Sequence, residues 1–329
     1  MYSQMCIDIT GHCNAQCHWC PNPIERKMDL PRGFMEPAFF ENVLDRLEAI
    51  KAISPEKTYI ALFNWGEPAL HKKFPEFTKI LTNRNYNWTF STNASVLPAL
   101  DGCNFSRLHY VIFSMPGFSQ ESYERIHGFD FKKVMNNIDE YRKEIKRHSS
   151  LTEIRISYHV YQFNLDELPE AQQWAKQNGF FFNPHFAQLG VFDWGIDFLK
   201  GTLSPDILAK ASEELFLFYV KPLAATCPEN YECPQFSILT LDEFGNVLTC
   251  CGVPRSHPQY KLGSVFEMSL DDIESKRKQQ EVCIDCLKTG AAYCGHNVQF
   301  FKQAFPKEKS ITTIVKKLRK SRFVKNIFS

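Results

Sequence analysis

The stretch GHCNAQCHWCPNP, residues 11–23, holds Cys13, Cys17 and Cys20 in a CxxxCxxC spacing and ends in turn residues. It directly follows MCIDIT (residues 5–10), an apolar run that predicts a buried strand. Three thiolates are one fewer than a structural zinc site or a ferredoxin-type cluster takes from the protein. The spacing therefore predicts a metal centre with one open position, placed at the end of the first strand.

Strand-like and helix-like segments alternate outward from this loop. Short apolar runs predict strands, and longer amphipathic runs predict helices between them. The predicted strands are MCIDIT (5–10), YIALFNW (59–65), NWTFSTN (87–93), HYVIFSM (109–115), EIRISYHVY (153–161) and FFFNPHF (180–186). The predicted helices span about residues 37–50, 75–83, 120–126, 131–147 and 165–177. Repeated βα units predict an α/β fold, a barrel or open barrel whose chemistry lies at the carboxyl ends of the strands.

Composition and charge narrow the function classes. Apolar residues make up 44% of the 329 positions, and the formal net charge of +1 argues against a general nucleic-acid binder, which needs a strongly basic face. The sequence has no long apolar span and no signal peptide, so we expect a cytoplasmic protein. Twelve cysteines in a reducing compartment predict metal binding rather than disulfides.

The cysteine loop and the ends of the next strands resemble the radical S-adenosylmethionine superfamily. The family signature is CxxxCxxC with an aromatic residue before the third cysteine, and Trp19 occupies that position. NWGEP (64–68) resembles the family's GGEP element, with Trp65 in place of the first glycine. STNA (91–94) is similar to STNG, and FSMPG (113–117) stands where many members have SLDG.

This resemblance covers residues 4 to about 190 and implies a partial (β/α)6 TIM-like barrel. It implies that Cys13, Cys17 and Cys20 hold a [4Fe-4S] cluster whose open iron binds S-adenosylmethionine. Reductive cleavage of that cofactor gives a 5′-deoxyadenosyl radical that abstracts a substrate hydrogen atom, with electrons from a donor such as flavodoxin or ferredoxin. The residues that it implies for cofactor binding are Gly66, Glu67, Ser91, Thr92, Asn93 and Ser114.

Seven further cysteines lie in the last third of the chain, where the pattern resembles the SPASM and twitch subfamilies. A cysteine, eleven residues, a glycine, four residues and a second cysteine match their first motif, and a CxxC follows. DEFGNVLTCC (242–251) predicts a hairpin that turns at Gly245. Seven thiols cannot fill two fully cysteine-ligated clusters, so we expect one auxiliary [4Fe-4S] cluster. Its expected ligands are Cys233, Cys250, Cys283 and Cys286, with Cys227 and Cys294 in reserve.

Alternatives remain open for the second cysteine group and for the protein class. A structural zinc knuckle is the alternative to the auxiliary cluster, because tetrahedral sulfur sites suit zinc as well as iron. In related enzymes an auxiliary cluster accepts an electron from the substrate radical or anchors the substrate. Cys251 is a candidate hydrogen donor for an epimerisation, although a buried structural cysteine is commoner. A non-enzymatic iron-sulfur electron carrier is the rival class, but it leaves the GEP, STN and serine elements unexplained.

The substrate class has two candidates. SPASM and twitch relatives act on ribosomally made peptides, on protein side chains and on small sugars or aminocyclitols. The first predicted strand begins within about six residues of Met1, which leaves no room before it for a peptide-recognition domain. We therefore expect a small, sugar-like substrate or a biosynthetic intermediate, with a peptide maturase or epimerase as the alternative.

We expect three regions along the chain. Residues 1–200 form the core domain, residues 201–303 form the SPASM/twitch-like iron-sulfur domain, and residues 304–329 form a tail. From Lys307 onward the tail carries eight basic residues and one acidic residue, with apolar residues near helical spacing. This pattern predicts a basic amphipathic helix. Such a helix suits a weak contact with a membrane or an acidic partner, or it docks on the body with its basic face in water.

Overall fold

One sheet runs through the described part of the chain. The computed structural model describes residues 1–28, 30–254, 257–297 and 311–325. Within these residues the strands pair in the order β6-β5-β4-β3-β2-β1-β7-β8-β9. Their bounds are β1 Gln4–Ile7, β2 Tyr59–Ala61, β3 Trp88–Thr92, β4 Leu108–Met115, β5 Glu153–Val160, β6 Phe181–Phe186, β7 Ile238–Leu241, β8 Asn246–Leu248 and β9 Lys261–Ser264.

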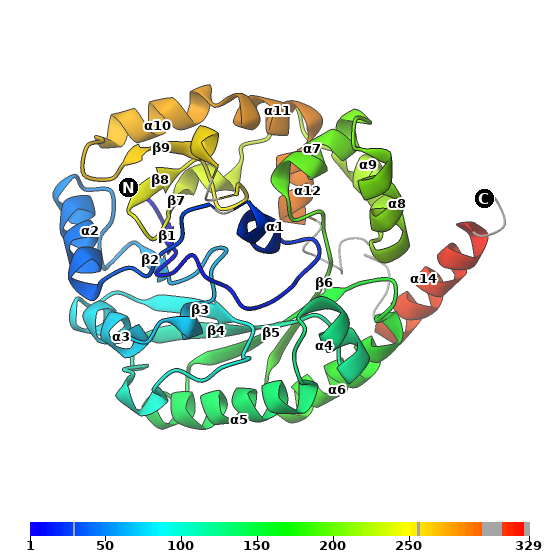
Figure 1. Ribbon diagram of the computed structural model, residues 1–329, viewed down its shortest axis with the longest axis horizontal. Helices are drawn as coiled ribbons and strands as arrows, with labels where there is room; N and C mark the ends of the chain where they lie inside the picture. Colours follow the sequence, from blue (N-terminus) through cyan, green and yellow to red (C-terminus); the bar gives the residue numbers. More distant parts are fainter. Residues whose placement is uncertain (29, 255–256, 298–310, 326–329) are drawn as a thin grey trace.

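Strands β1 to β6 are parallel throughout and form a partial barrel, as predicted (Figure 1). Every strand predicted from the sequence is present. The helices on the outer face of the barrel are α2 Pro37–Ala49, α3 Phe74–Asn83, α5 Phe131–His148 and α6 Leu168–Gln177. The helix expected over residues 165–177 begins as a 3-10 turn, Leu165–Glu167, before α6. A mixed α/β fold with a parallel sheet is therefore confirmed.

Alternation along each strand separates the outer face of the barrel from its interior. In β4 the side chains of Val111, Phe113 and Met115 are fully buried, whereas Ser114 is half-buried. The Phe113 ring lies 5.5 Å from the ring of Tyr141 on α5, so this set faces the helices. Because successive strand residues point to opposite faces, Ser114 faces the barrel interior.

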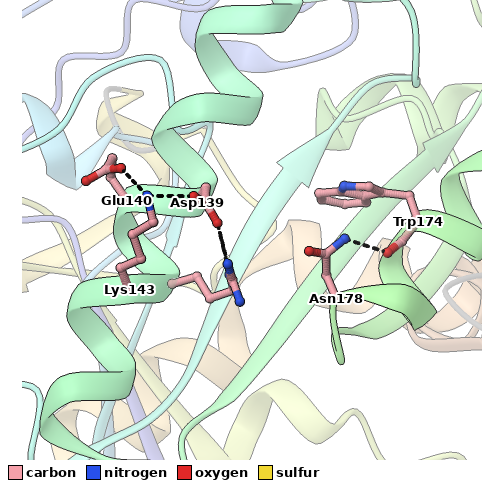
Figure 2. A network of polar contacts seen from close by, with 6 residues as sticks. Asp139, Glu140, Lys143, Trp174 and Asn178 are labelled. Carbon is pink, nitrogen blue, oxygen red and sulfur yellow. Dashed lines mark hydrogen bonds and ion pairs between the residues drawn. The ribbon is translucent and has the colours of Figure 1, made fainter.

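The outer helices present charged pairs to solvent. Figure 2 shows Lys143 on α5 contacting Asp139 at 2.9 Å and Glu140 at 2.8 Å. At the end of α6, the Asn178 side chain donates to the Trp174 carbonyl at 2.9 Å (Figure 2). Exposed pairs of this kind contribute less than about 1 kcal/mol each. These pairs belong to the solvated outer surface. The candidate site is therefore sought in the barrel interior.

The last third of the chain extends the same sheet. Strand β7 pairs in parallel with β1, from Gln4 opposite Ile238 to Ile7 opposite Leu241. The predicted hairpin is present: β7 and β8 are antiparallel, and Gly245 adopts a φ of +77° in the turn between them. The sheet crosses the expected division at residue 200, so that division stays an untested prediction.

Helix α1 follows the first cysteine loop, and α7, α11 and α12 border the second cysteine group, whereas α4 packs on α5 and α14 on α6. Figure 1 places α10 and α11 beyond the added strands, and α1 near the mouth of the barrel. Their bounds, and those of the remaining helices, are α1 Pro21–Lys27, α4 Gln120–Ile126, α7 Phe192–Lys200, α8 Pro205–Glu214, α9 Val220–Ala224, α10 Leu270–Gln279, α11 Glu281–Thr289, α12 Ala291–Asn297 and α14 Ile311–Lys325. Short 3-10 turns span Pro68–Leu70, Leu100–Gly102, Leu217–Tyr219, Pro234–Ser237 and Pro258–Tyr260.

The tail contains the predicted helix, and this helix is docked. In α14 the side chains of Ile314, Val315 and Leu318 are buried in the main core. Arg319 forms an ion pair with Asp166, which lies just before α6. The apolar side chains that the structure describes in α14 are thus covered by the protein, and a contact through the exposed basic face stays a proposal. No described helix is long and apolar enough to span a membrane.

Candidate active site

The first cysteine loop lies at the carboxyl end of β1, as predicted. Helix α1 starts directly after Cys20, whose N–H donates to the Cys17 carbonyl at 3.2 Å. Burial raises the pKa of the Cys20 thiol to about 12. Burial also raises the pKa of Cys17 well above its usual value, and the neighbouring Cys20 and Cys13 thiols add to that rise. Such coupling requires short separations, so the three thiols face a common region.

Two close contacts fix the shape of this loop. The Arg26 guanidinium on α1 donates to the Cys13 carbonyl at 3.1 Å and to the Ala15 carbonyl at 2.6 Å. On the other side, a Cβ on Gly190 would lie 2.2 Å from the Trp19 carbonyl oxygen. The backbone after β6 can therefore approach the loop only because residue 190 is glycine.

The NWGEP segment after β2 packs directly against the cysteine loop. The buried Asp8 carboxylate accepts hydrogen bonds from the N–H groups of Asn64 at 2.8 Å, Trp65 at 3.2 Å and Gly66 at 3.0 Å. A Cβ on Gly66 would lie 1.8 Å from the Thr10 carbonyl oxygen. Residue 66 must therefore be glycine for the two segments to meet.

The Glu67 carboxylate is buried and fully engaged with its neighbours. Its oxygens accept from the Ala69 N–H at 3.1 Å, the Thr92 hydroxyl at 2.7 Å and the Asn93 N–H at 2.7 Å. Burial raises its pKa to about 7, and these hydrogen bonds limit the rise. Glu67 and the end of β3 therefore form one unit, in which the sequence expectation of cofactor contact stays a proposal.

Asn93 links this unit to the first thiol. Its side-chain nitrogen lies 4.0 Å from the Cys13 sulfur and donates to the Asn14 side chain at 3.1 Å. Its side-chain oxygen accepts from the Ser95 N–H at 2.9 Å. The next residue, Ala94, adopts a φ of 54°, the conformation that favours glycine, which is what the family has at this position.

Ser91 and Ser114 lie apart from that cluster, on the interior face of the barrel. Both are half-buried and alternate with buried residues that face the helices. Ser114 pairs with Ser157 on β5, which lies opposite Asn183 on β6. The structure therefore brings Cys13, Glu67, Thr92 and Asn93 together at one edge, whereas the two serines lie on the interior face of the barrel.

Two residues that the sequence interpretation missed hold these loops in place. Asp8 is the first, and Glu214 at the end of α8 is the second. The Glu214 carboxylate accepts from the Trp19 indole at 2.8 Å and from Arg125 at 3.1 Å, with the His18 ring at 3.5 Å. Although burial raises its pKa, these donors lower it overall, so the carboxylate is ionised. No local sequence pattern indicates the role of Asp8 or of Glu214, because the partners of each residue lie far from it along the chain.

A histidine pair lines the barrel interior near the same edge. His159 on β5 lies opposite His185 on β6, and their ring centroids are 4.7 Å apart. Desolvation lowers the pKa of His185 to about 4 and that of His159 well below its usual value. Both rings are therefore neutral near pH 7.

A second site lies between the barrel and the added strands. It is a cavity of about 340 Å³ whose wall combines cysteines, aromatic side chains and one buried arginine. Its cysteines are Cys233, Cys250, Cys251, Cys283, Cys286 and Cys294. Trp65 also lines it, and the Trp65 indole donates to the Val253 carbonyl at 2.8 Å. The residue that replaces the family's first glycine therefore links the two sites.

The predicted auxiliary ligands are mutual neighbours. Burial raises the pKa of Cys283 to about 11, and the Cys250 thiol adds to that rise. Burial likewise raises the pKa of Cys286, with contributions from Cys250, Cys233 and Cys283. All four predicted ligands line the same cavity, and their thiols lie close enough to raise one another's pKa.

The remaining cysteines of this group have different surroundings. The Cys251 thiol donates to the Gln235 side-chain oxygen at 3.0 Å. The Cys294 thiol donates to the Val220 carbonyl at 3.4 Å, and the half-buried Cys227 to the Pro228 carbonyl at 3.7 Å. A further cavity residue, His296, places its ring nitrogen 3.9 Å from the Cys233 sulfur.

Comparison with known proteins identifies the family. Residues 7–171, just over half of the chain, match the family described as the Radical SAM superfamily. The chain belongs to the radical SAM superfamily. Membership means a radical SAM enzyme, which implies a [4Fe-4S] cluster and S-adenosylmethionine. This argues against the alternative of a non-enzymatic iron-sulfur electron carrier.

Solved structures share the fold of this radical SAM protein. Native anSMEcpe with bound AdoMet aligns with a TM-score of 0.58 at 16% identity, covering 95% of this chain and 99% of that one. Native anSMEcpe with bound AdoMet and Cp18Cys peptide gives 0.55 at 17%, covering 96% and 99%. Streptococcus suis SuiB bound to precursor peptide SuiA gives 0.56 at 14%, covering 94% and 74%. At these identities the likeness shows the fold alone, and no curated protein sequence matches the chain.

Proposed function

We propose that this radical SAM enzyme binds its first cluster through Cys13, Cys17 and Cys20 and uses an auxiliary [4Fe-4S] cluster in substrate oxidation or anchoring. The three coupled thiols on one loop, with no fourth cysteine beside them, fit a cluster that leaves one iron open. When bound and reduced, that cluster cleaves S-adenosylmethionine and supplies the 5′-deoxyadenosyl radical that abstracts a substrate hydrogen. Gly66 and Asn93 shape the edge where the cofactor would lie, and Glu67 holds that edge together.

One observation supports the auxiliary cluster above all. Four cysteines from segments far apart in the sequence line a single cavity of about 340 Å³, and they lie close enough to affect one another's pKa. Within the described residues, no three His, Cys, Asp or Glu side chains converge where one metal ion would bind. A [4Fe-4S] cluster takes four thiolates, the number that Cys233, Cys250, Cys283 and Cys286 supply, and zinc is the alternative outcome of the test.

Iron and product measurements test the proposal. Anaerobically reconstituted protein should contain about eight iron atoms per chain, as two [4Fe-4S] clusters require. With dithionite in place of the flavodoxin- or ferredoxin-type donor, it should release 5′-deoxyadenosine from S-adenosylmethionine. About four iron atoms, or zinc at the second site, would remove the auxiliary cluster from the proposal.

Two cysteine variants assign the iron to its sites. Replacing Cys13, Cys17 and Cys20 together with alanine should abolish 5′-deoxyadenosine and leave about half of the iron. Replacing Cys283 and Cys286 should also leave about half of the iron but retain slow, uncoupled cleavage of S-adenosylmethionine. Equal loss of all iron in both variants would mean that the two groups do not form separate sites.

The substrate class is the second part of the proposal. From the sequence we favour a small, sugar-like molecule or a biosynthetic intermediate. Two structural neighbours, anSMEcpe and SuiB, are known with a bound peptide, which supports the alternative of a peptide or protein side chain. Substrate-dependent 5′-deoxyadenosine formation, compared between an aminocyclitol panel and a panel of cysteine- and serine-containing peptides, separates the two. Deuterium transfer from the labelled substrate into 5′-deoxyadenosine identifies the reacting carbon.

Cys251 remains a candidate hydrogen donor. Cys251 is half-buried and lines the cavity, and its thiol donates to the Gln235 side-chain oxygen. Cys251→Ala should leave the iron content unchanged, because Cys251 is not among the proposed ligands. Retention of full product formation by that variant would rule the donor role out.

A further inference from the structure

Arg277 is a buried cation without a carboxylate partner. This side chain on α10 is 2% exposed and is among the largest fully buried side chains. Its guanidinium donates to the carbonyl oxygens of Thr249 at 2.9 Å, Ile238 at 3.0 Å and Gln235 at 2.5 Å, and it lies 5.4 Å from the centre of the Phe236 ring. Among the described residues, no Asp or Glu forms an ion pair with it. Carbonyl oxygens and a ring face carry only partial negative charge, so the site would favour an anion nearby.

The proposed auxiliary cluster supplies that anion. Arg277 lines the cavity with the cysteines. Two of the carbonyl groups that it contacts lie close to proposed ligands in the sequence. Thr249 directly precedes Cys250, and Gln235 lies two positions after Cys233. Four thiolates around an iron-sulfur core leave a net negative charge beside the guanidinium.

We infer that Arg277 is the fixed counter-charge of the auxiliary cluster and raises its reduction potential. This inference rests on the proposed function, because it requires that cluster. A reduced cluster carries one more negative charge than the oxidised form, so a positive charge nearby stabilises the reduced form more. The effect is strong in a buried site, where water screens little, and cluster potentials depend on local charge and solvent exposure. Arg277 is therefore a positioning and tuning residue for the auxiliary site, not a catalytic one.

The test measures the midpoint potential of the auxiliary cluster alone. The full chain with Cys13, Cys17 and Cys20 replaced by alanine serves as the background, so that one cluster contributes to the redox titration followed by EPR. In this background Arg277→Met should lower the midpoint potential, whereas Arg277→Lys, which keeps the charge, should stay near the parent value. Lys278→Gln removes an exposed charge from the same helix and should change nothing.

The outcomes separate this inference from the proposed function. A parent chain that binds no second cluster would overturn the proposed function, and the inference with it. A parent chain with its cluster, and an Arg277→Met variant with full iron and unchanged potential, would overturn the inference alone. If Arg277→Met fails to hold iron, Arg277→Lys and Arg277→Gln decide: a lower potential for the glutamine variant supports the inference, and equal potentials overturn it.

Discussion

Gly66 is the residue whose size most directly sets the geometry of the candidate active site. A Cβ at this position would lie 1.8 Å from the Thr10 carbonyl oxygen, and both partners are backbone that cannot swing aside. We expect Gly66→Ala to lower the free energy of unfolding by about 4 kcal/mol, the upper end of single-substitution effects. Urea unfolding followed by circular dichroism measures this loss.

A second glycine provides the matched control. At Gly102 an added Cβ would lie 3.3 Å from the Pro75 side chain, which can adjust. Gly102→Ala should therefore change the free energy of unfolding by less than about 1 kcal/mol. Equal losses in the two variants would contradict the argument that close backbone approach is special to residue 66.

The His159–His185 pair gives the fold an acid sensitivity. The pKa of His185 falls from 6.5 to about 4 on folding because the ring is desolvated, so the unfolded chain binds more protons between these values. Stability is then complete above pH 6.5 and is lost as the pH falls through this window. When the pH falls from 7.5 to 5.5, the free energy of unfolding of His185→Gln should decrease by about 1 kcal/mol less than that of the wild type.

Urea unfolding at the two pH values measures the difference, and His109→Gln is the control. His109 is exposed on the surface, so its replacement should leave the acid-induced loss as in the wild type. An unchanged loss in His185→Gln would mean that the interior histidine does not pass from charged to neutral on folding.

Single residues also mark how far sequence interpretation reaches at the site. Gly66, Glu67, Thr92 and Asn93 were found because they belong to short motifs at strand ends. The structure places Gly66, Glu67 and Asn93 against residues 10–13, and Thr92 bonds to Glu67. Asp8 was missed although it lies only five positions before Cys13, because its partners are backbone N–H groups that any residue carries. An acceptor for backbone groups leaves no pattern in the sequence.

Among the elements, the parallel strands and outer helices were predictable because each is specified locally. Amphipathic spacing and terminal signals act within one segment: the Asp130 side chain caps α5 by accepting from the Lys133 N–H at 2.6 Å, and basic residues end that helix. The pairing of β7 with β1 was not predictable. It joins residues more than two hundred positions apart, and a four-residue strand carries too little pattern to select its partner.

The tail helix α14 provides a prediction at the scale of an element. Leu318 is 1% exposed and packs in the main core, so Leu318→Ala should cost about 2–4 kcal/mol of unfolding free energy. Lys316→Gln, on the exposed face, should cost less than about 0.5 kcal/mol. Urea unfolding of both variants measures the contrast.

The docked position of α14 also predicts whether the chain binds to membranes. Because the apolar face of α14 is covered, we expect the full chain to remain in the supernatant when sedimented with anionic liposomes. Binding that disappears on deletion of residues 307–329 would show instead that the helix leaves its docked position.

For the whole molecule, the continuous sheet joins the two cysteine regions into one structure. The first cysteine loop follows β1, and Cys250, a proposed ligand, follows β8, two strands away in the same sheet. The hydrogen bond from the Trp65 indole to the Val253 carbonyl adds a direct link between the two regions. If both proposed clusters bind, the sheet would hold them in fixed positions relative to each other.

This continuity predicts that residues 1–200 do not fold as an independent domain. The fragment would lack β7, and β1 would then present its hydrogen-bonding groups along an open edge with Met5, Cys6 and Ile7 exposed beside it. Such edges drive aggregation. We expect the fragment to elute as aggregates in size-exclusion chromatography, while the full chain unfolds in one transition that tryptophan fluorescence and circular dichroism report at the same urea concentration. A monomeric fragment with native-like helix content would contradict this expectation and would make residue 200 a true domain boundary.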